Sequence, residues 1–279
     1  MDFTALPPHV RNVFHAPDEP ARAMGAAWDY GWKVGSVVFS QVAHPVRAAW
    51  SSRIREKLQP EGVRIVRPIK STDGRFINAG WRASSFAPGI LTRRVDETVA
   101  AALRLDLALS TVEVPASFKD VDDTDVFSIA DHIAWHASLT SAIDLQDSVP
   151  RHLTAINIMP KVELLLREID APNQVVHADM FATTLYAGVQ APTVTDVMGV
   201  ARPYGYTAAI SIIDALCVGA VDEGIIGRFS HVPHLDQLLL RALAYRTAVH
   251  ALHPDATSNT GTNLEWVAKT VMSKVSVTL

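Results

Sequence analysis

The spacing of apolar residues changes once along the chain, and this change limits the folds that the chain can adopt. Before residue 88, short apolar runs are separated by turn residues, whereas later apolar residues recur every three or four positions over long stretches. The first pattern is typical of strands and the second of amphipathic helices. The sequence therefore predicts an α+β fold with a β-rich N-terminal lobe over residues 1–88 and a helical C-terminal lobe over residues 89–279.

Within the first lobe we expect the order strand, strand, helix, strand, strand. Residues 32–42 contain two short runs on either side of a glycine, which is the pattern of a hairpin. Residues 44–58 have a proline near the first turn and helical apolar spacing. Residues 62–69 and 75–86 read as a second strand pair, separated by the turn signal STDG. The predicted buried face of the helix consists of Val46, Ala49, Trp50, Ile54 and Leu58.

The second lobe is predicted to be mainly helical, with a short loop-and-strand region between residues 177 and 197. A Pro- and Asp-rich loop is expected at 114–125, and Pro160 is expected to break the helix that contains it. The predicted helices span residues 93–110, 126–139, 151–169, 206–221, 235–252 and 263–275.

Composition narrows the functional classes. Hydrophobic residues make up 48% of the chain and charged residues 19%, so a sizeable core can form. A net charge of −4 gives no electrostatic footprint for non-specific nucleic-acid binding. The single cysteine, Cys217, excludes an internal disulfide framework. The first ten residues lack the pattern of a secretory signal and no window reaches eighteen apolar residues, so we expect a cytoplasmic protein without a membrane span.

The most specific motif lies at residues 175–186, which read VVHADMFATTLY. An HxD triplet after an apolar run is typical of the catalytic loop of a kinase-fold phosphotransferase. Such loops carry an asparagine four or five residues after the aspartate, but here Thr183 and Thr184 occupy those positions. The chain contains neither a GxSxG nor a GxxxxGK[ST] motif, which argues against an α/β-hydrolase and a P-loop NTPase.

This lobe order, with an HxD loop inside the helical lobe, resembles the aminoglycoside and choline phosphotransferase branch of the protein-kinase-like fold. The blocks at 63–81, 174–180, 201–217 and 236–246 also look like a family of uncharacterised actinobacterial phosphotransferase-like proteins. The resemblance covers nearly the whole chain. It implies a two-lobed fold and, in an active member, phosphoryl transfer from ATP with Mg²⁺.

The resemblance also assigns roles to individual residues. Asp179 matches the catalytic aspartate that orients the acceptor hydroxyl, and His177 matches the histidine that supports the same loop. Asp196, in PTVTDVMG, matches the aspartate that binds magnesium, for which a carboxylate is a suitable hard ligand. Thr183 or Thr184 stands where the second magnesium ligand would be, and a threonine hydroxyl is shorter than an asparagine carboxamide.

The strand lysine of the family is missing, because Ser40 occupies its position after VVF. The loss of a charge-assisted contact of about 1.5–3 kcal/mol should lower nucleotide affinity at least tenfold. Lys33, on the preceding strand, is a candidate replacement, and its alternative role is that of a solvated strand residue. Glu56 is the helix residue predicted to pair with the lysine, or else an exposed glutamate.

The phosphate-covering loop is altered as well. Relatives use a glycine-rich turn that lets backbone amides approach the phosphates, but here only Gly25 and Gly31 remain. Trp28, Asp29 and Tyr30 stand between them and would block or repel a triphosphate.

Two functions stay open. The first is an active small-molecule phosphotransferase that uses ATP and Mg²⁺, with Lys33 in place of the lost lysine. The second, which these departures favour, is a pseudo-phosphotransferase that binds a small molecule or a protein without transferring phosphate. A homodimer contact through the apolar helix at 238–244 is a further possibility, and burial within the helical lobe is its alternative.

Overall fold

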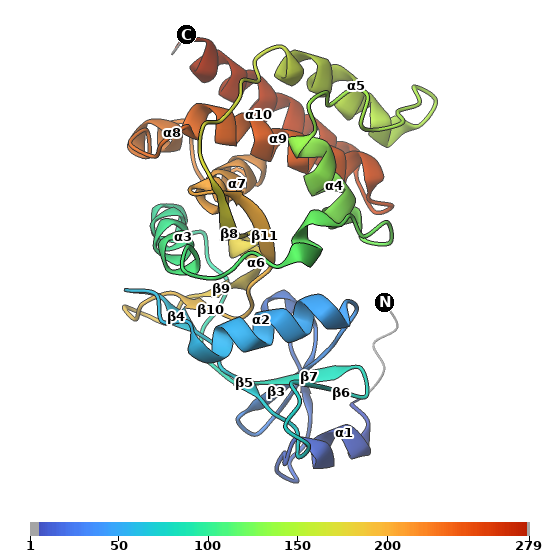
Figure 1. The fold of residues 1–279 in the computed structure, drawn as a ribbon, viewed down its shortest axis with the longest axis vertical. Coiled ribbons are helices and arrows are strands. Elements are labelled where there is room, and N and C mark those ends of the chain that lie inside the picture. The colour runs from blue at the N-terminus through green and yellow to red at the C-terminus, as the bar shows by residue number, and fades with distance from the viewer. Residues whose placement is uncertain (1–5, 278–279) are drawn as a thin grey trace. The chain divides into compact units, whose positions relative to one another are not determined.

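The computed structural model describes residues 6–277, and packing divides the chain into two compact units (Figure 1). One unit combines residues 1–113 with 175–200, and the other combines 114–174 with 201–279. The predicted lobe boundary after residue 88 stays a prediction, because the units group residues by packing and interleave along the chain. The first five residues, which belong to the segment predicted to lack a secretory signal, lie outside the described residues.

The larger sheet of the first unit has six antiparallel strands. Their order is β1-β2-β3-β7-β5, and β6 pairs with β7 beside β5. The predicted hairpin is confirmed as β2 and β3, and Gly35 takes a left-handed φ of 56° in its two-residue turn. The strands are β1 (Arg22–Ala23), β2 (Trp32–Val34), β3 (Val37–Gln41), β5 (Pro68–Ile69), β6 (Ile77–Asn78) and β7 (Trp81–Ser85).

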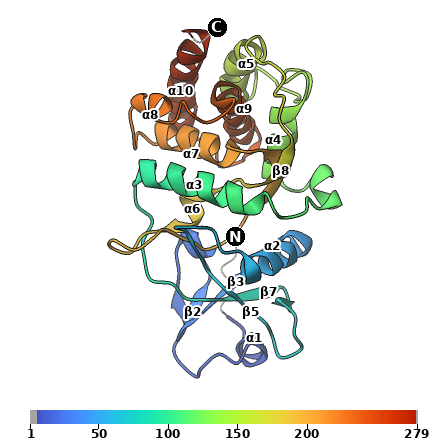
Figure 2. The same cartoon turned by 60° about the vertical axis from the view of Figure 1, so that its left-hand side comes forward.

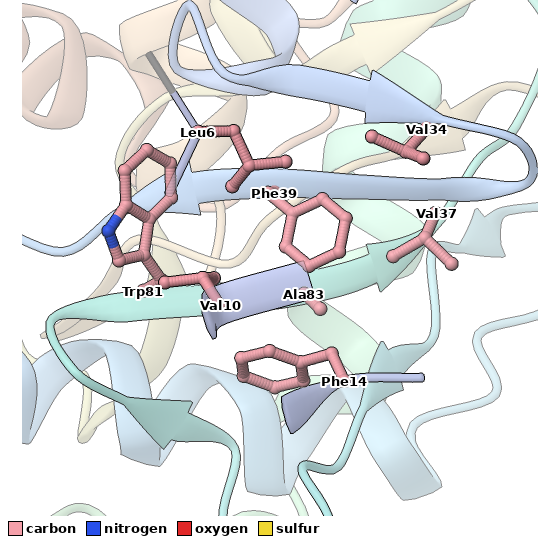
Figure 3. Close-up of a cluster of buried hydrophobic side chains, with 8 residues drawn as sticks. All are labelled: Leu6, Val10, Phe14, Val34, Val37, Phe39, Trp81 and Ala83. Atoms are coloured by element: carbon pink, nitrogen blue, oxygen red, sulfur yellow. The ribbon is translucent and has the colours of Figure 1, made fainter. Parts of the chain in front are cut away.

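One face of this sheet is covered by a short helix, α1 (Pro8–Val13), which the sequence pattern did not predict. Figure 3 shows side chains from α1 and from β2, β3 and β7 meeting in one cluster. The rings of Phe14 and Phe39 meet edge to face at 5.9 Å between centroids. The buried members of the cluster are Leu6, Val10, Phe14, Val34, Val37, Phe39, Trp81 and Ala83.

Helix α2 (Pro45–Lys57) is present as predicted, but its buried face differs from the prediction. Trp50 is buried, whereas Val46 is 70% exposed. The buried face also includes the polar residues Ser51, Ser52 and Arg55. Apolar spacing alone could not identify this face, because Ser51 and Arg55 are buried through polar contacts with a distant carboxylate, described below.

The second strand pair of the prediction is only partly correct. Strand β5 pairs with β7 as expected, but β4 (Arg64–Ile65) lies parallel to β10 (Thr193–Val194), which also pairs with β9 (Thr184–Leu185). The amide of Val66 donates to the carbonyl of Val194 and continues this pairing. The same unit contains α3 (Val95–Leu109), η1 (Ala26–Trp28) and α6 (Met180–Thr183). Strands β8 (Asn173–His177) and β11 (Gly199–Pro203), whose residues are divided between the two units, form a further two-stranded sheet.

The second unit is built around α9, which packs against α4, α5, α7 and α10 (Figure 2). Helix α9 is apolar around most of its circumference and is correspondingly buried. Packing inside the unit therefore accounts for the apolar residues at 238–244 without a dimer contact. The helices are α4 (Val126–Trp135), α5 (Pro150–Glu163), α7 (Tyr206–Cys217), α8 (Gly224–Arg228), α9 (Leu235–Leu252) and α10 (Ser258–Val277), with η2 (Ala116–Lys119) before them.

The α+β class is confirmed, and one helix prediction is wrong in detail. Helix α5 continues through Pro160 and ends at Glu163, because buried Met159 and Val162 pack on either side of the proline. The proline lies within the last turn, so the helix continues for only three residues beyond it. Among the described residues, no helix has both the length and the hydropathy to cross a membrane.

Candidate functional site

The HxD loop begins where β8 ends. Asp179 is the N-cap of α6, and its Oδ1 accepts a hydrogen bond from the amide of Ala182 at 3.4 Å. The Asp179 side chain is partly buried. The loop therefore holds this carboxylate in a fixed local setting, in which it caps a four-residue helix.

His177 is buried, and its ring is hydrogen-bonded to Thr183 and to Met198. The amide of Met198 donates to His177 Nδ1 at 2.8 Å, so the ring proton lies on Nε2, which donates to Thr183 Oγ1 at 2.8 Å. Burial lowers the pKa of His177 to about 4, and the ring is neutral at pH 7. This geometry agrees with a supporting role for the histidine.

The two threonines at the expected asparagine position are already hydrogen-bonded. The Thr183 hydroxyl donates to the carbonyl of Asp179, and the Thr183 carbonyl accepts from the amide of Thr195 at 2.8 Å. The Thr184 hydroxyl contacts the sulfur of Met180 at 3.8 Å. Both threonines are buried and serve the local structure of the loop.

Asp196 is buried and bound by two arginines. Its Oδ2 lies 2.7 Å from Arg82 Nη1, and its Oδ1 lies 3.2 Å from Arg55 Nε. The Ser51 hydroxyl and the amide of Val197 also donate to Oδ1, at 2.5 and 2.9 Å. Burial acts to raise the pKa of Asp196, but attraction to the two arginines outweighs it and holds the pKa well below its usual range.

Arg55 reaches this carboxylate from α2 and is fully buried. Its Nη1 donates to the carbonyls of Thr195 and Val66, at 2.9 and 3.2 Å. Burial lowers the pKa of Arg55 to about 10, so the side chain is still charged at pH 7. A buried cation of this kind is stable only because a carboxylate and two carbonyls surround it.

Arg82 reaches Asp196 from β7, where its Cα is paired with that of Ser40 on β3. Its Nη2 binds the carboxylate of Asp29. Burial acts to lower the pKa of Arg82, yet the pKa is raised because both carboxylates stabilise the charged form. The sequence analysis assigned no role to either arginine. For Arg82 the available signal was its place within a predicted strand of small and apolar residues, because arginine is rarely buried unless it is paired.

Ser40, Lys33 and Glu56, the residues discussed for the missing lysine, each make other contacts. The Ser40 hydroxyl is buried and donates to the carbonyl of Trp28 at 3.0 Å. The Lys33 ammonium lies over the ring of Phe86, 4.3 Å from its centroid. Glu56 pairs with Lys70 at 2.7 Å on the exposed side of α2, which fits the exposed alternative rather than the pairing role. The cations beside Asp196 are therefore Arg55 and Arg82.

The segment between the two glycines forms the short helix η1 instead of an open phosphate loop. Trp28 is buried and stacks on Phe86 at 5.8 Å, whereas Tyr30 is 52% exposed, so Trp28 fills this space and Tyr30 does not. A Cβ on Gly31 would lie 2.0 Å from the carbonyl oxygen of Phe39, while a Cβ on Gly25 would meet nothing within 4 Å. Packing against β3 therefore explains the glycine at position 31.

These side chains leave a cavity of about 10 Å³ in the first unit, which is room for one water molecule. It is lined by Ala27, Trp28, Asp29, Ser40, Arg82, Ser84, Thr183, Thr195 and Asp196.

The residues present do not fit a magnesium–nucleotide complex. Both oxygens of Asp196 are engaged by arginines, and the Thr183 hydroxyl is engaged within its own loop. Arg55 and Arg82 would repel a divalent cation at this carboxylate. Among residues 6–277, no group of three or more His, Cys, Asp and Glu side chains is arranged to hold a metal ion.

Comparison with known proteins supports the fold. The chain matches no protein-family model and no curated protein by sequence. By structure it is similar to the amicoumacin kinase hAmiN, solved with AMP-PNP, Ca²⁺ and Ami, at 12% identity and a TM-score of 0.59, covering 95% of this chain and 92% of that one. An aminoglycoside phosphotransferase from Alicyclobacillus acidocaldarius gives 12% identity and a TM-score of 0.60, covering 98% and 96%.

The AMP-bound spectinomycin phosphotransferase APH(9)-Ia is similar at 11% identity and a TM-score of 0.62, covering 95% of this chain and 96% of that one. These matches confirm the fold predicted from the sequence. The chain has the protein-kinase-like fold of the aminoglycoside phosphotransferases.

Proposed function

We propose that this protein is a pseudo-phosphotransferase, which keeps the kinase-like fold and acts by binding rather than by transferring phosphate. The observation that carries the proposal is the pairing of Asp196 with Arg55 and Arg82. Phosphoryl transfer needs this carboxylate for magnesium, because the metal neutralises charge on the phosphates. A carboxylate that is already neutralised by two buried cations has no comparable affinity for the metal.

The filled cavity supports the same conclusion. The Ser40 hydroxyl donates a hydrogen bond to the Trp28 carbonyl where phosphates would lie, and the remaining space holds about one water molecule. The partner of the protein is then a small molecule or another protein, with no role for nucleic acid. A cytoplasmic location belongs to the same proposal.

An active small-molecule kinase is the second candidate, and Asp179 is the observation that favours it. Its carboxylate is retained at the N-cap of α6 and is only partly buried. The similar structures include phosphotransferases solved with AMP-PNP or ADP. In this alternative, Arg55 and Arg82 would have to release Asp196 when ATP and Mg²⁺ enter.

Isothermal titration of the purified protein with ATP, with and without Mg²⁺, separates the two candidates. The pseudo-phosphotransferase gives no magnesium-dependent binding up to low millimolar ATP. Magnesium-dependent binding that is lost in Asp196→Asn would support the active kinase instead. The same titration of Asp179→Asn serves as a control, because the orienting carboxylate is not itself a ligand for the nucleotide.

A further inference from the structure

We propose that Arg82 is the centre of a metal-independent binding site for a phosphate or diphosphate group, and that the Asp29 carboxylate occupies this site as an internal anion. The inference rests on the proposed loss of the magnesium site and deepens it, because it names the class of ligand that the altered site accepts. Every residue in the argument lies in the first compact unit.

The first support is the position of Arg82. It is the strand partner of Ser40, and both side chains line the same cavity. An arginine presents several donors in a planar fork, so it can bind one anion on one side and another anion on the other. Asp196 occupies Nη1 at 2.7 Å, and Asp29 occupies Nη2.

The second support is the difference between the two carboxylates. The Asp196 side chain is 9% exposed and has four donors, whereas the Asp29 side chain is 44% exposed. Asp196 is therefore a fixed part of the core, and Asp29 is the carboxylate that an anion from solvent can displace. A phosphate oxygen would take the same place at Nη2 with the same charge-assisted geometry.

The backbone at Asp29 supports displacement as well. Asp29 and Tyr30 both have left-handed conformations, with φ of 50° and 52°. Such conformations are unfavourable for residues with a Cβ and persist where other contacts compensate. The ion pair with Arg82 is one such contact beside the backbone hydrogen bonds of the turn, so its loss to a ligand favours movement of Asp29 away from the cavity.

The local charge decides the class of ligand. Arg55 and Arg82 are balanced by Asp196 and Asp29, so the cluster is neutral as it stands. Removal of the Asp29 carboxylate leaves one positive charge in a largely buried setting. Such a site attracts an anion and repels Mg²⁺, and we therefore expect free phosphate groups to bind better than their magnesium complexes.

The test is a titration of the full chain with inorganic pyrophosphate in the presence of excess EDTA. Asp29→Asn keeps the size of the side chain, tolerates a left-handed backbone and removes the charge. Asp18→Asn is the matched control, because it removes the same charge from an exposed position. We expect Asp29→Asn to bind pyrophosphate at least about tenfold more tightly than the wild type and Asp18→Asn, which is the range of one charge-assisted contact.

A second variant guards against misfolding. Asp29→Gly also removes the carboxylate and relieves the left-handed backbone, so it is expected to fold. Adding Arg82→Met to a folded Asp29 variant should abolish the gain. If neither Asp29 variant binds pyrophosphate more tightly than Asp18→Asn, or if the gain requires Mg²⁺, the inference is overturned. Magnesium-dependent ATP binding by the wild type would instead overturn the proposed function, so the two failures are distinguishable.

Discussion

Ser40 and Arg82 are directly paired across strands β3 and β7, and the charge expected on the first residue is found on the second. Both side chains line the same small cavity, but the cation enters it from the neighbouring strand. From there it binds Asp196, the carboxylate to which the family resemblance assigns magnesium. The position at which the resemblance expects a lysine is therefore uncharged, and the cation of the cavity is Arg82.

Replacement of Arg82 should destabilise the protein strongly. In Arg82→Met, Asp196 stays buried and loses its shortest ion pair, so we expect a loss of about 3–5 kcal/mol in the free energy of unfolding. Urea denaturation followed by circular dichroism measures this loss. The control is Arg75→Met, since the Arg75 side chain is 74% exposed and should contribute under about 1 kcal/mol. Equal losses in the two variants would contradict a structural role for the buried network.

Stability should fall in mild acid because of His177. Its pKa is about 4 in the folded protein and about 6.5 when unfolded, so between these values the unfolded chain binds more protons. The contribution of His177 to the free energy of unfolding is therefore complete above pH 6.5. It is lost as pH falls towards 4, by about 3 kcal/mol in all. Asp196, whose folded pKa is also lowered, adds a further loss below its ordinary value of about 3.9.

Urea denaturation between pH 4 and pH 7.5 measures this dependence. His177→Gln can still donate to Thr183 but does not titrate, so its curve should be flatter between pH 6.5 and 4. A wild-type curve as flat as that of the variant would show that His177 is not held neutral.

Alanine substitution should lower stability strongly at Gly31 and hardly at all at Gly25, the two glycines of the altered loop. Gly31→Ala would bring a Cβ to 2.0 Å from the carbonyl oxygen of Phe39, and a backbone atom cannot move aside cheaply. We expect a loss of at least about 3 kcal/mol, as for other severe overpacking. Gly25→Ala meets open space and should stay within about 0.5 kcal/mol of the wild type. Thermal unfolding of the two variants side by side checks this, and tolerance of Gly31→Ala would argue against the packing of η1 on β3.

Lys33 should contribute through Phe86 rather than through a ligand. Lys33→Ala removes a cation–π contact at a strand position, which is worth about 0.5–1 kcal/mol. Affinity for ATP or pyrophosphate should be the same as in Ser40→Ala, measured by the same titration. A clearly weaker affinity in Lys33→Ala than in Ser40→Ala would restore Lys33 as the replacement for the strand lysine.

The elements that the sequence predicted correctly are those whose signal is local. Helices α3, α7 and α9 follow from apolar spacing, and the β2–β3 hairpin follows from Gly35 between two apolar runs. The buried face of α2 and the partner of β4 were wrong, because they depend on Asp196 and on strand β10, far along the chain. Arg82 contacts Asp196, which lies 114 positions further along the chain, and no local pattern reports such a pair.

The roles of the individual site residues stay predictions, but the structure shows which contacts their side chains make. Asp179, His177 and Asp196 could be assigned by resemblance, and the loss at Ser40 could be read from one position. The pairing of Asp196 with Arg55 and Arg82 could not be predicted, because the resemblance assigns no role to either arginine. Tyr30 was predicted to block the site beside Trp28, but it is exposed because its left-handed backbone turns the chain after η1.

The charge balance of this cluster also limits how the protein can change over time. Substitution of Ser40 by lysine would supply the cation that the resemblance expects, yet it would add a third positive charge beside Arg55 and Arg82. The repulsion would weaken the core before any magnesium could bind. Under the proposed function, metal-dependent chemistry would therefore require replacement of Ser40, Arg55 and Arg82 together, with unstable proteins at the intermediate steps. Selection for stability alone would keep the altered site in place.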